Sequence, residues 1–168
     1  MQVFTYNIFY RLIYKFGNIL ITILLLIYLI PVALNLDKSL ILIIPFVVSL
    51  IIIYYVNKKY LDFYKIVPYK IEADDDKIIC SDFSLRKKVF TIYYKDMESL
   101  TGGIFDAKHR GLMKVYDGKN KICIGFFDRM TNSNKLVTII LSKVDKKIYD
   151  EVIDHLQSKK VMPKGKNK

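Results

Sequence analysis

The sequence predicts an α+β protein: a two-helix transmembrane hairpin, then an antiparallel β barrel or sandwich, capped by one or more C-terminal helices. Three observations lead to this prediction. Two long runs without a charged residue follow each other near the N-terminus, and short β-branched and aromatic segments between turn residues fill the middle. A helical repeat of apolar residues then ends the chain. The 168 residues therefore divide into an apolar anchor and a soluble domain of ordinary size.

The two charge-free runs are residues 16–36, which number 21, and residues 39–57, which number 19. A helix rises about 1.5 Å per residue, so either run can cross the roughly 30 Å hydrocarbon core of a bilayer. A cleaved signal peptide is the alternative for the first run. Its apolar stretch is long, no small-residue cleavage site follows it, and a second span comes next. We therefore expect a multi-pass transmembrane hairpin over residues 16–57.

Basic residues flank the expected hairpin at both of its ends rather than in its loop. Arg11 and Lys15 precede the first span, whereas the connecting loop has Lys38 beside Asp37. Four lysines follow the second span: Lys58, Lys59, Lys65 and Lys70. Since Lys and Arg collect on the cytoplasmic side of a membrane, we expect a bacterial inner membrane protein with both termini in the cytoplasm.

Residues 1–15 are expected to form an interfacial amphipathic segment. Within residues 3–16 the apolar side chains recur at near-helical spacing, at Val3, Phe4, Ile8, Leu12 and Ile13. This spacing predicts a helix that lies along the inner surface of the membrane.

Proline and polar residues interrupt both expected spans. Pro31 and Pro45 lie at a similar depth, and a matched pair of helix breaks can mark a transport site. Because the spans contain no Asp, Glu, Lys, Arg or His, we interpret both prolines as packing kinks. Asn18, Thr22 and Ser49 are available for hydrogen bonds between the spans.

Residues 66–158 are expected to form a cytoplasmic domain that begins with five or six antiparallel strands. Asp74-Asp75-Asp76 and Asp117-Gly118-Lys119-Asn120 are turn signals between paired segments. The expected strands are residues 67–73, 77–81, 88–94, 97–100, 112–116 and 121–126. Gly102-Gly103 lacks the Gly-Lys-Ser/Thr of a phosphate-binding loop, so it indicates a bulge or bend in the sheet.

Helices are expected to end the domain. A polar residue within 131–134 can cap a first helix, and a break is expected near Asp145. Beyond it, an apolar stripe would cover an open face of the sheet, formed by Ile148, Tyr149, Val152, Ile153 and Leu156. Residues 159–168 are rich in lysine and are expected to be a disordered basic tail.

This order of elements resembles the bacterial PH-like domain, found in small membrane proteins with two N-terminal spans and a cytoplasmic domain. The resemblance rests on the pair of spans, the closing helix, and the stretches YKIEADDDKIICS, KVFTIYYKDMESLTGG and GLMKVYDGKNKICIGF. It implies a strongly bent antiparallel barrel or sandwich capped by the C-terminal helix. It implies no particular activity.

Basic clusters provide the candidate contact residues of the expected domain. Some eukaryotic PH domains bind phosphoinositides through basic residues around the first hairpin, where this chain has Asp74 to Asp76, which would repel phosphate. The candidate contacts to a protein partner or, without specificity, to an anionic phospholipid surface are Arg86, Lys87, Lys88, Lys108, His109, Arg110 and Arg129. The alternative is that these clusters are solvated turns.

Catalytic, metal and nucleic-acid signals are weak. His109 and His155 have no nucleophile beside them in the sequence, and Cys80 and Cys123 form no CxxC motif. We therefore expect no enzyme, no cofactor and no metal, and we expect the cysteines to be buried thiols in a reducing compartment. Of the 27 basic residues, many flank the spans or lie in the tail, which favours topology and lipid contact over nucleic-acid binding.

The functional hypothesis is a membrane-anchored binding or scaffolding protein. It would recruit a protein partner through an exposed sheet edge or through the loops at residues 106–111 and 128–134. The alternative is an accessory subunit that joins a transporter or envelope complex through its spans. An enzyme that acts on a lipid-linked substrate is a third option.

Overall fold

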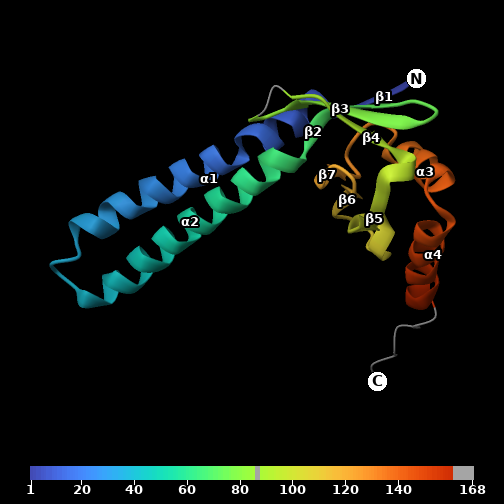
Figure 1. Ribbon diagram of the computed structural model, residues 1–168. Helices are drawn as coiled ribbons and strands as arrows, with labels where there is room; N and C mark the ends of the chain where they lie inside the picture. The colour runs from blue at the N-terminus through green and yellow to red at the C-terminus, as the bar shows by residue number, and fades with distance from the viewer. Residues whose placement is uncertain (86–87, 161–168) are drawn as a thin grey trace. The chain divides into compact units, whose positions relative to one another are not determined.

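The computed structural model of the chain describes residues 1–85 and 88–160. Within these ranges the fold is α+β, with two long helices, antiparallel sheets and two C-terminal helices (Figure 1). The chain divides into two compact units. We call Ile8–Lys65 the helical unit, and we call Met1–Asn7 together with the chain from Ile66 onward the β unit.

The helical unit consists of α1 (Ile8–Leu34), the short 3-10 helix η1 (Leu40–Leu42) and α2 (Ile43–Ile66). Both long helices are long and apolar enough to cross a membrane. In their most apolar stretches, 11% and 6% of the residues are buried, far fewer than in a helix of a soluble core. The apolar side chains of this unit therefore face outward.

A polar network joins the two helices of the hairpin. Asn18 Nδ2 donates to Asn57 Oδ1 at 3.0 Å, and Asn57 Nδ2 donates to Thr22 Oγ1 at 2.9 Å. The Tyr64 hydroxyl lies 2.6 Å from Asn18 Oδ1 and 2.7 Å from the Lys15 carbonyl oxygen. These bonds confirm the predicted roles of Asn18 and Thr22, while Asn57 and Tyr64 were not foreseen. Bonds of this kind set the register of two apolar helices.

The two prolines occupy different helical positions. Pro31 lies inside α1, three residues before the helix ends at Leu34. Pro45 is the third residue of α2, in a first turn whose N–H groups have no partner within the helix. The interpretation as a matched pair of kinks is therefore wrong for Pro45, which starts a helix rather than breaking one.

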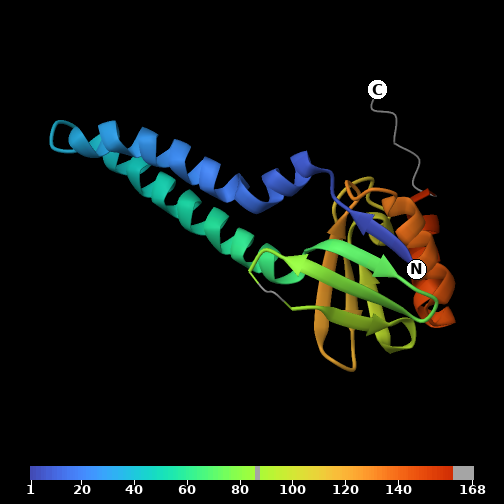
Figure 2. The ribbon, with the colours of Figure 1, turned by 90° about the horizontal axis from the view of Figure 1, so that it is seen from above.

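The β unit contains two antiparallel sheets, whose strands can be followed in Figure 2 by the chain colours. In the described ranges one sheet has the order β1-β2-β3-β4 and the other β5-β6-β7. The strands are β1 (Gln2–Thr5), β2 (Pro68–Ala73), β3 (Lys77–Phe83), β4 (Phe90–Tyr93), β5 (Met97–Thr101), β6 (Leu112–Asp117) and β7 (Ile122–Phe127). These described strands form no closed barrel, so the barrel alternative is wrong.

The first strand corrects the expected interfacial helix. β1 pairs with β2 in antiparallel register, with Phe4 opposite Ile71, and α1 starts only at Ile8. Burial alternates as a strand requires, since Phe4 is 2% and Tyr6 6% exposed while Val3 is 53% exposed. The same apolar residues fit a helical period and a strand period. Pairing with β2, more than 60 residues away in the sequence, selects the strand. The helical hairpin is therefore inserted between two paired strands of the β unit.

Turn chemistry explains the β6–β7 hairpin, which the sequence predicted. The carboxylate of Asp117 is buried at the turn and accepts the Asn120 N–H at 3.0 Å and Asn120 Nδ2 at 2.7 Å. Lys121 has the left-handed φ of 53° that returns the chain to β7. The two strands bring Met113 and Phe126 into register in a fully buried position.

Two helices, α3 (Ser133–Lys143) and α4 (Lys146–Lys160), end the described chain. Leu136 and Ile140 of α3 are fully buried. The predicted break near Asp145 is confirmed, and Asp145 Oδ1 accepts the Lys147 N–H at 2.9 Å in the first turn of α4. Since α4 continues to Lys160, the expected tail cannot start at residue 159, and residues 161–168 lie outside the described residues.

Candidate binding site

Four of the predicted contact residues line one open hollow of about 920 Å³ in the β unit: Lys108, His109, Arg110 and Arg129. We call this site the cationic hollow. The other lining residues are Ile104, Ala107, Asp128, Ser133, Asn134, Ile153, Leu156 and Gln157. The loops 106–111 and 128–134 were predicted as contact regions for a protein partner. The structure brings them together, and it adds a third wall from α4.

Glycine geometry shapes the first wall, the loop from the end of β5 to the start of β6. Gly102 has φ 79°, and a Cβ there would collide with the Leu112 carbonyl oxygen. The 3-10 helix η3 (Gly103–Asp106) follows, and its Phe105 side chain is fully buried. Ala107 then takes a left-handed φ of 54°, which turns residues 108–110 toward solvent. The predicted bend at Gly102-Gly103 is thus confirmed as the feature that presents the basic cluster.

Asp106 stabilises this loop as an anion. The Gly102 backbone N–H donates to its carboxylate and is the main reason that the pKa of Asp106 lies below its ordinary value. Lys108 Nζ at 3.3 Å and the charge of His155 lower the pKa further, against the opposing effect of burial. Lys108 is therefore partly neutralised by its own loop.

The second wall, residues 128–134, is held by local bonds. Ser133 Oγ donates to the Asp128 carbonyl oxygen at 2.8 Å, and the left-handed Asn132 precedes α3. Arg129 Nε lies 3.8 Å from Asp128 Oδ2, a loose ion pair at a partly exposed position. The wall thus carries an arginine at a partly exposed position.

The N-terminal strand region also fixes this second wall. The Tyr6 hydroxyl accepts the Phe127 N–H at 2.8 Å, and the Thr131 N–H donates to the Thr5 carbonyl oxygen at 2.8 Å. Tyr6 also forms an antiparallel bridge with Met130. A sequence-based interpretation missed this contact because its two sides are more than 120 residues apart.

Helix α4 forms the third wall and makes it apolar. Ile148 and Val152 are buried, and α4 packs against η3 and β5. Ile153 and Leu156 are half-buried and line the hollow together with Gln157. Their stripe was predicted as a core face, but the end of that stripe borders the site.

The basic side chains that line the hollow differ in whether they form an ion pair. Asp106 contacts Lys108, and Asp128 contacts Arg129. For Arg110, an exposed side chain, the described part of the chain offers neither an ion pair nor a hydrogen bond. Arg110 therefore presents a complete guanidinium fork to a ligand.

The remaining predicted residues lie elsewhere. Lys88 is exposed just before β4 and does not line the hollow, while Arg86 and Lys87 lie outside the described residues. Cys80 is buried, which raises the pKa of its thiol, and Cys123 is half-buried on β7. Among residues 1–85 and 88–160, no group of three His, Cys, Asp or Glu side chains is placed to hold a metal ion.

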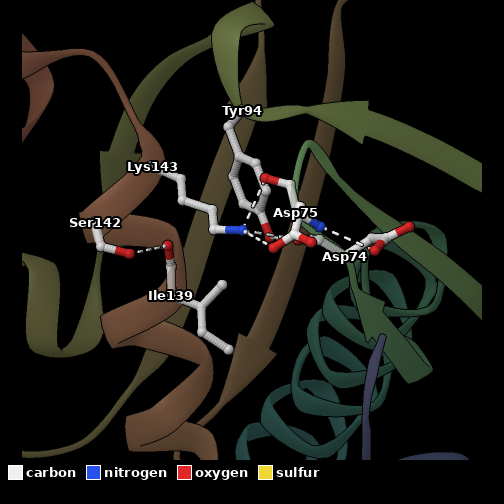
Figure 3. Close-up of polar contacts among 6 residues, drawn as sticks. All are labelled: Asp74, Asp75, Tyr94, Ile139, Ser142 and Lys143. Atoms are coloured by element: carbon white, nitrogen blue, oxygen red, sulfur yellow. Dashed lines mark hydrogen bonds and ion pairs between the residues drawn. The ribbon is translucent and has the colours of Figure 1, made fainter.

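The acidic turn between β2 and β3 has an internal cationic partner (Figure 3). Lys143 Nζ of α3 lies 2.8 Å from the Asp75 carbonyl oxygen, 2.9 Å from Asp75 Oδ1 and 3.3 Å from the Asp74 carbonyl oxygen. The same ammonium lies 5.4 Å from the ring centre of Tyr94, within cation–π range. This contact ties the turn to α3, so Lys143 is occupied by the fold itself.

Electrostatics agree with this arrangement. The hydrogen bond from Lys143 is the main cause that lowers the pKa of the Asp75 carboxyl. The Tyr94 hydroxyl donates to the Asp74 carbonyl oxygen at 3.2 Å, and burial, followed by the charges of Asp74 and Asp75, raises its pKa to about 12. The turn is therefore a structural contact, and the cationic hollow is the stronger candidate for a ligand.

A scan of protein-family models, a search of curated proteins and a search of solved structures gave no match for this chain.

Proposed function

We propose that this chain is a membrane-anchored binding module whose β unit recruits a protein partner through the cationic hollow. The observation that carries the proposal is that Arg110 and Arg129, from two loops, line one hollow with the apolar Ile153 and Leu156. Solvated turns would scatter their charges, whereas a concave site with an apolar part and a few convergent polar groups is typical of ligand recognition.

The exposed apolar surface of α1 and α2 supports the anchor. Side chains such as Leu24 at 59% and Ile27 at 61% exposure would face lipid in a bilayer. The hairpin leaves the β unit after Asn7 and returns to it at Ile66. If α1 and α2 each cross the membrane, the second crossing brings the chain back to the side of β1, where β2 can pair with it.

Charge supports a cytoplasmic position for the β unit. Basic residues occur in the first turns of α1 and the last turns of α2, at Arg11, Lys15, Lys58, Lys59 and Lys65. By the positive-inside rule they belong on the cytoplasmic face of a bacterial inner membrane. Since β1 pairs with β2, the N-terminus shares that face in this proposal.

We further infer that the β unit is a PH-like domain. Its two antiparallel sheets followed by C-terminal helices support this inference. The position of the hairpin differs from the implied layout, because β1 precedes the spans. In this proposal the anchor is an insertion into the domain rather than an extension before it.

Site-specific photo-crosslinking in native membranes tests recruitment. A photoactivatable phenylalanine derivative replaces Asn134, which lines the hollow, and in a second protein it replaces Lys119, in the β6–β7 turn. We expect a protein adduct of defined mass at position 134 that disappears with Arg110→Glu and persists with the matched exposed-site control Lys114→Glu. Equal adducts at both positions, or adducts insensitive to Arg110, would overturn the proposal.

A further inference from the structure

We propose that the cationic hollow binds an acidic amphipathic segment of the partner protein, one that combines carboxylates with apolar side chains. This inference rests on the proposed function and specifies the chemistry of the partner. It follows from three features of the site: an excess of cations, a half-buried apolar wall, and the exclusion of other occupants by charge.

Cations outnumber anions in the lining. In the described chain the lining contains Lys108, Arg110 and Arg129 and one carboxylate, that of Asp128, while Asp106, outside the lining, pairs with Lys108. Arg110 has no ion pair among the described residues, and its planar fork suits the two oxygens of a carboxylate. Arg129 adds a second, partly exposed guanidinium, whose ion pair with Asp128 is long at 3.8 Å.

Apolar side chains in the lining indicate that the ligand carries apolar groups as well as negative charge. Ile104 and Ala107 of the first wall, and Ile153 and Leu156 of α4, line the hollow in half-buried positions. A purely anionic ligand would leave these surfaces in water, whereas a segment with apolar residues beside its carboxylates would bury them. The combination favours an amphipathic ligand over a polyanion.

Other occupants meet repulsion. Residues 161–168 of this chain contain three lysines and no acidic residue, so their charge opposes entry into a cationic site. On α4, the exposed Asp150, Glu151 and Asp154 lie within one or two turns of Ile153 and Leu156. These carboxylates would repel a broad anionic surface such as a membrane that covered α4 as well as the hollow, whereas they do not line the hollow itself.

Peptide binding to the full-length protein tests this inference. The protein is placed in nanodiscs of uncharged phosphatidylcholine, and fluorescence anisotropy follows a labelled peptide of about 14 residues, roughly four helical turns. Its Glu residues occupy one helical face and its Leu residues the other. Comparison peptides are polyglutamate of equal length and a version with Lys in place of Glu. Phosphatidylglycerol vesicles serve as the lipid competitor.

We expect the acidic amphipathic peptide to bind about tenfold more tightly than polyglutamate, and the lysine version not to bind. Arg110→Glu with Arg129→Glu should weaken peptide binding about tenfold or more, whereas the matched exposed-site control Lys114→Glu with Lys119→Glu should change it less than about twofold. Leu156→Gln should weaken binding of the amphipathic peptide without affecting polyglutamate. Far-UV circular dichroism and thermal unfolding establish that each variant is folded.

Equal binding of the amphipathic peptide and polyglutamate would overturn the inference, as would equal losses in both double variants. Complete competition by phosphatidylglycerol vesicles would do the same and identify lipid as the occupant. An Arg110-dependent protein adduct at position 134 under any of these results would leave the proposed function standing. Absence of both peptide binding and such an adduct would refute the two together.

Discussion

The helical unit and the β unit place their apolar residues in opposite directions. In the helical unit, Leu24 and Ile27 point outward while Asn18 and Asn57 bond to each other between the helices. In the β unit, residues such as Phe126 are fully buried, and lysines such as Lys114 and Lys119 are exposed. The membrane proposed around the helical unit would explain the contrast, because apolar surface leaves water but has no reason to leave lipid. The chain passes from one arrangement to the other after Asn7 and back again before Ile66.

Excision of the hairpin should produce the largest effect. Replacement of Ile8–Lys65 by a short Gly-Ser linker joins Asn7 to Ile66 and removes the exposed apolar surface. We expect a β unit that is monodisperse in buffer without detergent by size-exclusion chromatography. As a control, the fragment that starts at residue 66 lacks β1, exposes the β2 edge and should aggregate. If the fragment without β1 is monodisperse as well, β1 does not belong to the unit.

The next prediction concerns the strand that replaced the expected interfacial helix. Phe4 is buried against the sheet and Val3 is exposed, so Phe4→Ala should lower the free energy of unfolding by about 3–5 kcal/mol. Val3→Ala should change it by less than about 0.5 kcal/mol. Denaturant unfolding of the hairpin-excised protein measures both values. Similar small effects at the two positions would favour an interfacial segment over β1.

A smaller effect is expected from Tyr6→Phe. The ring keeps its place, but the Phe127 N–H loses its acceptor at 2.8 Å, which should cost about 1–3 kcal/mol. Hydrogen exchange should accelerate at Phe127 and Thr131, beside the second wall of the hollow. Unchanged exchange there, with normal exchange elsewhere, would contradict the link between β1 and that wall.

The corresponding change in the helical unit should be milder. Asn57→Leu removes the hydrogen bonds to Asn18 and Thr22, and bonds between membrane helices contribute about 0.6 kcal/mol on average. Unfolding of the full-length protein in mixed micelles measures the change. A loss of several kcal/mol would show that the hairpin packs as a soluble core does.

The smallest effect should come from the exposed ion pair at the acidic turn. The pKa of Asp75 is lowered by Lys143, so its stabilising contribution is present above the ordinary carboxyl pKa of about 3.9. That contribution is lost as the pH falls through the lowered pKa of the folded state. The difference between wild type and Asp75→Asn in urea midpoint should therefore shrink in acid and stay constant from pH 5 to pH 8. A difference that grows in acid would contradict this assignment.

Local patterns were sufficient for much of this fold. Charge-free length identified both long helices, and the Asp-Gly-Lys-Asn turn identified the β6–β7 hairpin. The same reasoning selected the loops 106–111 and 128–134 because they are basic and polar. It could not show that Arg110 and Arg129 line the same hollow, or that Ile153 and Leu156 join them, because loops and helix meet only after the sheets form.

Composition and period over short windows accordingly established two classes of segment, those suited to lipid and those suited to a water-exposed sheet. Contacts between distant residues settled everything that depends on a partner: the strand state of residues 2–5, the insertion of the hairpin, and the assembly of the hollow. The physical reason is that periodicity states which side chains seek burial, while the surface that buries them comes from another part of the chain. For Phe4 the neighbouring surface is β2. The hollow in turn is completed by residues of α4.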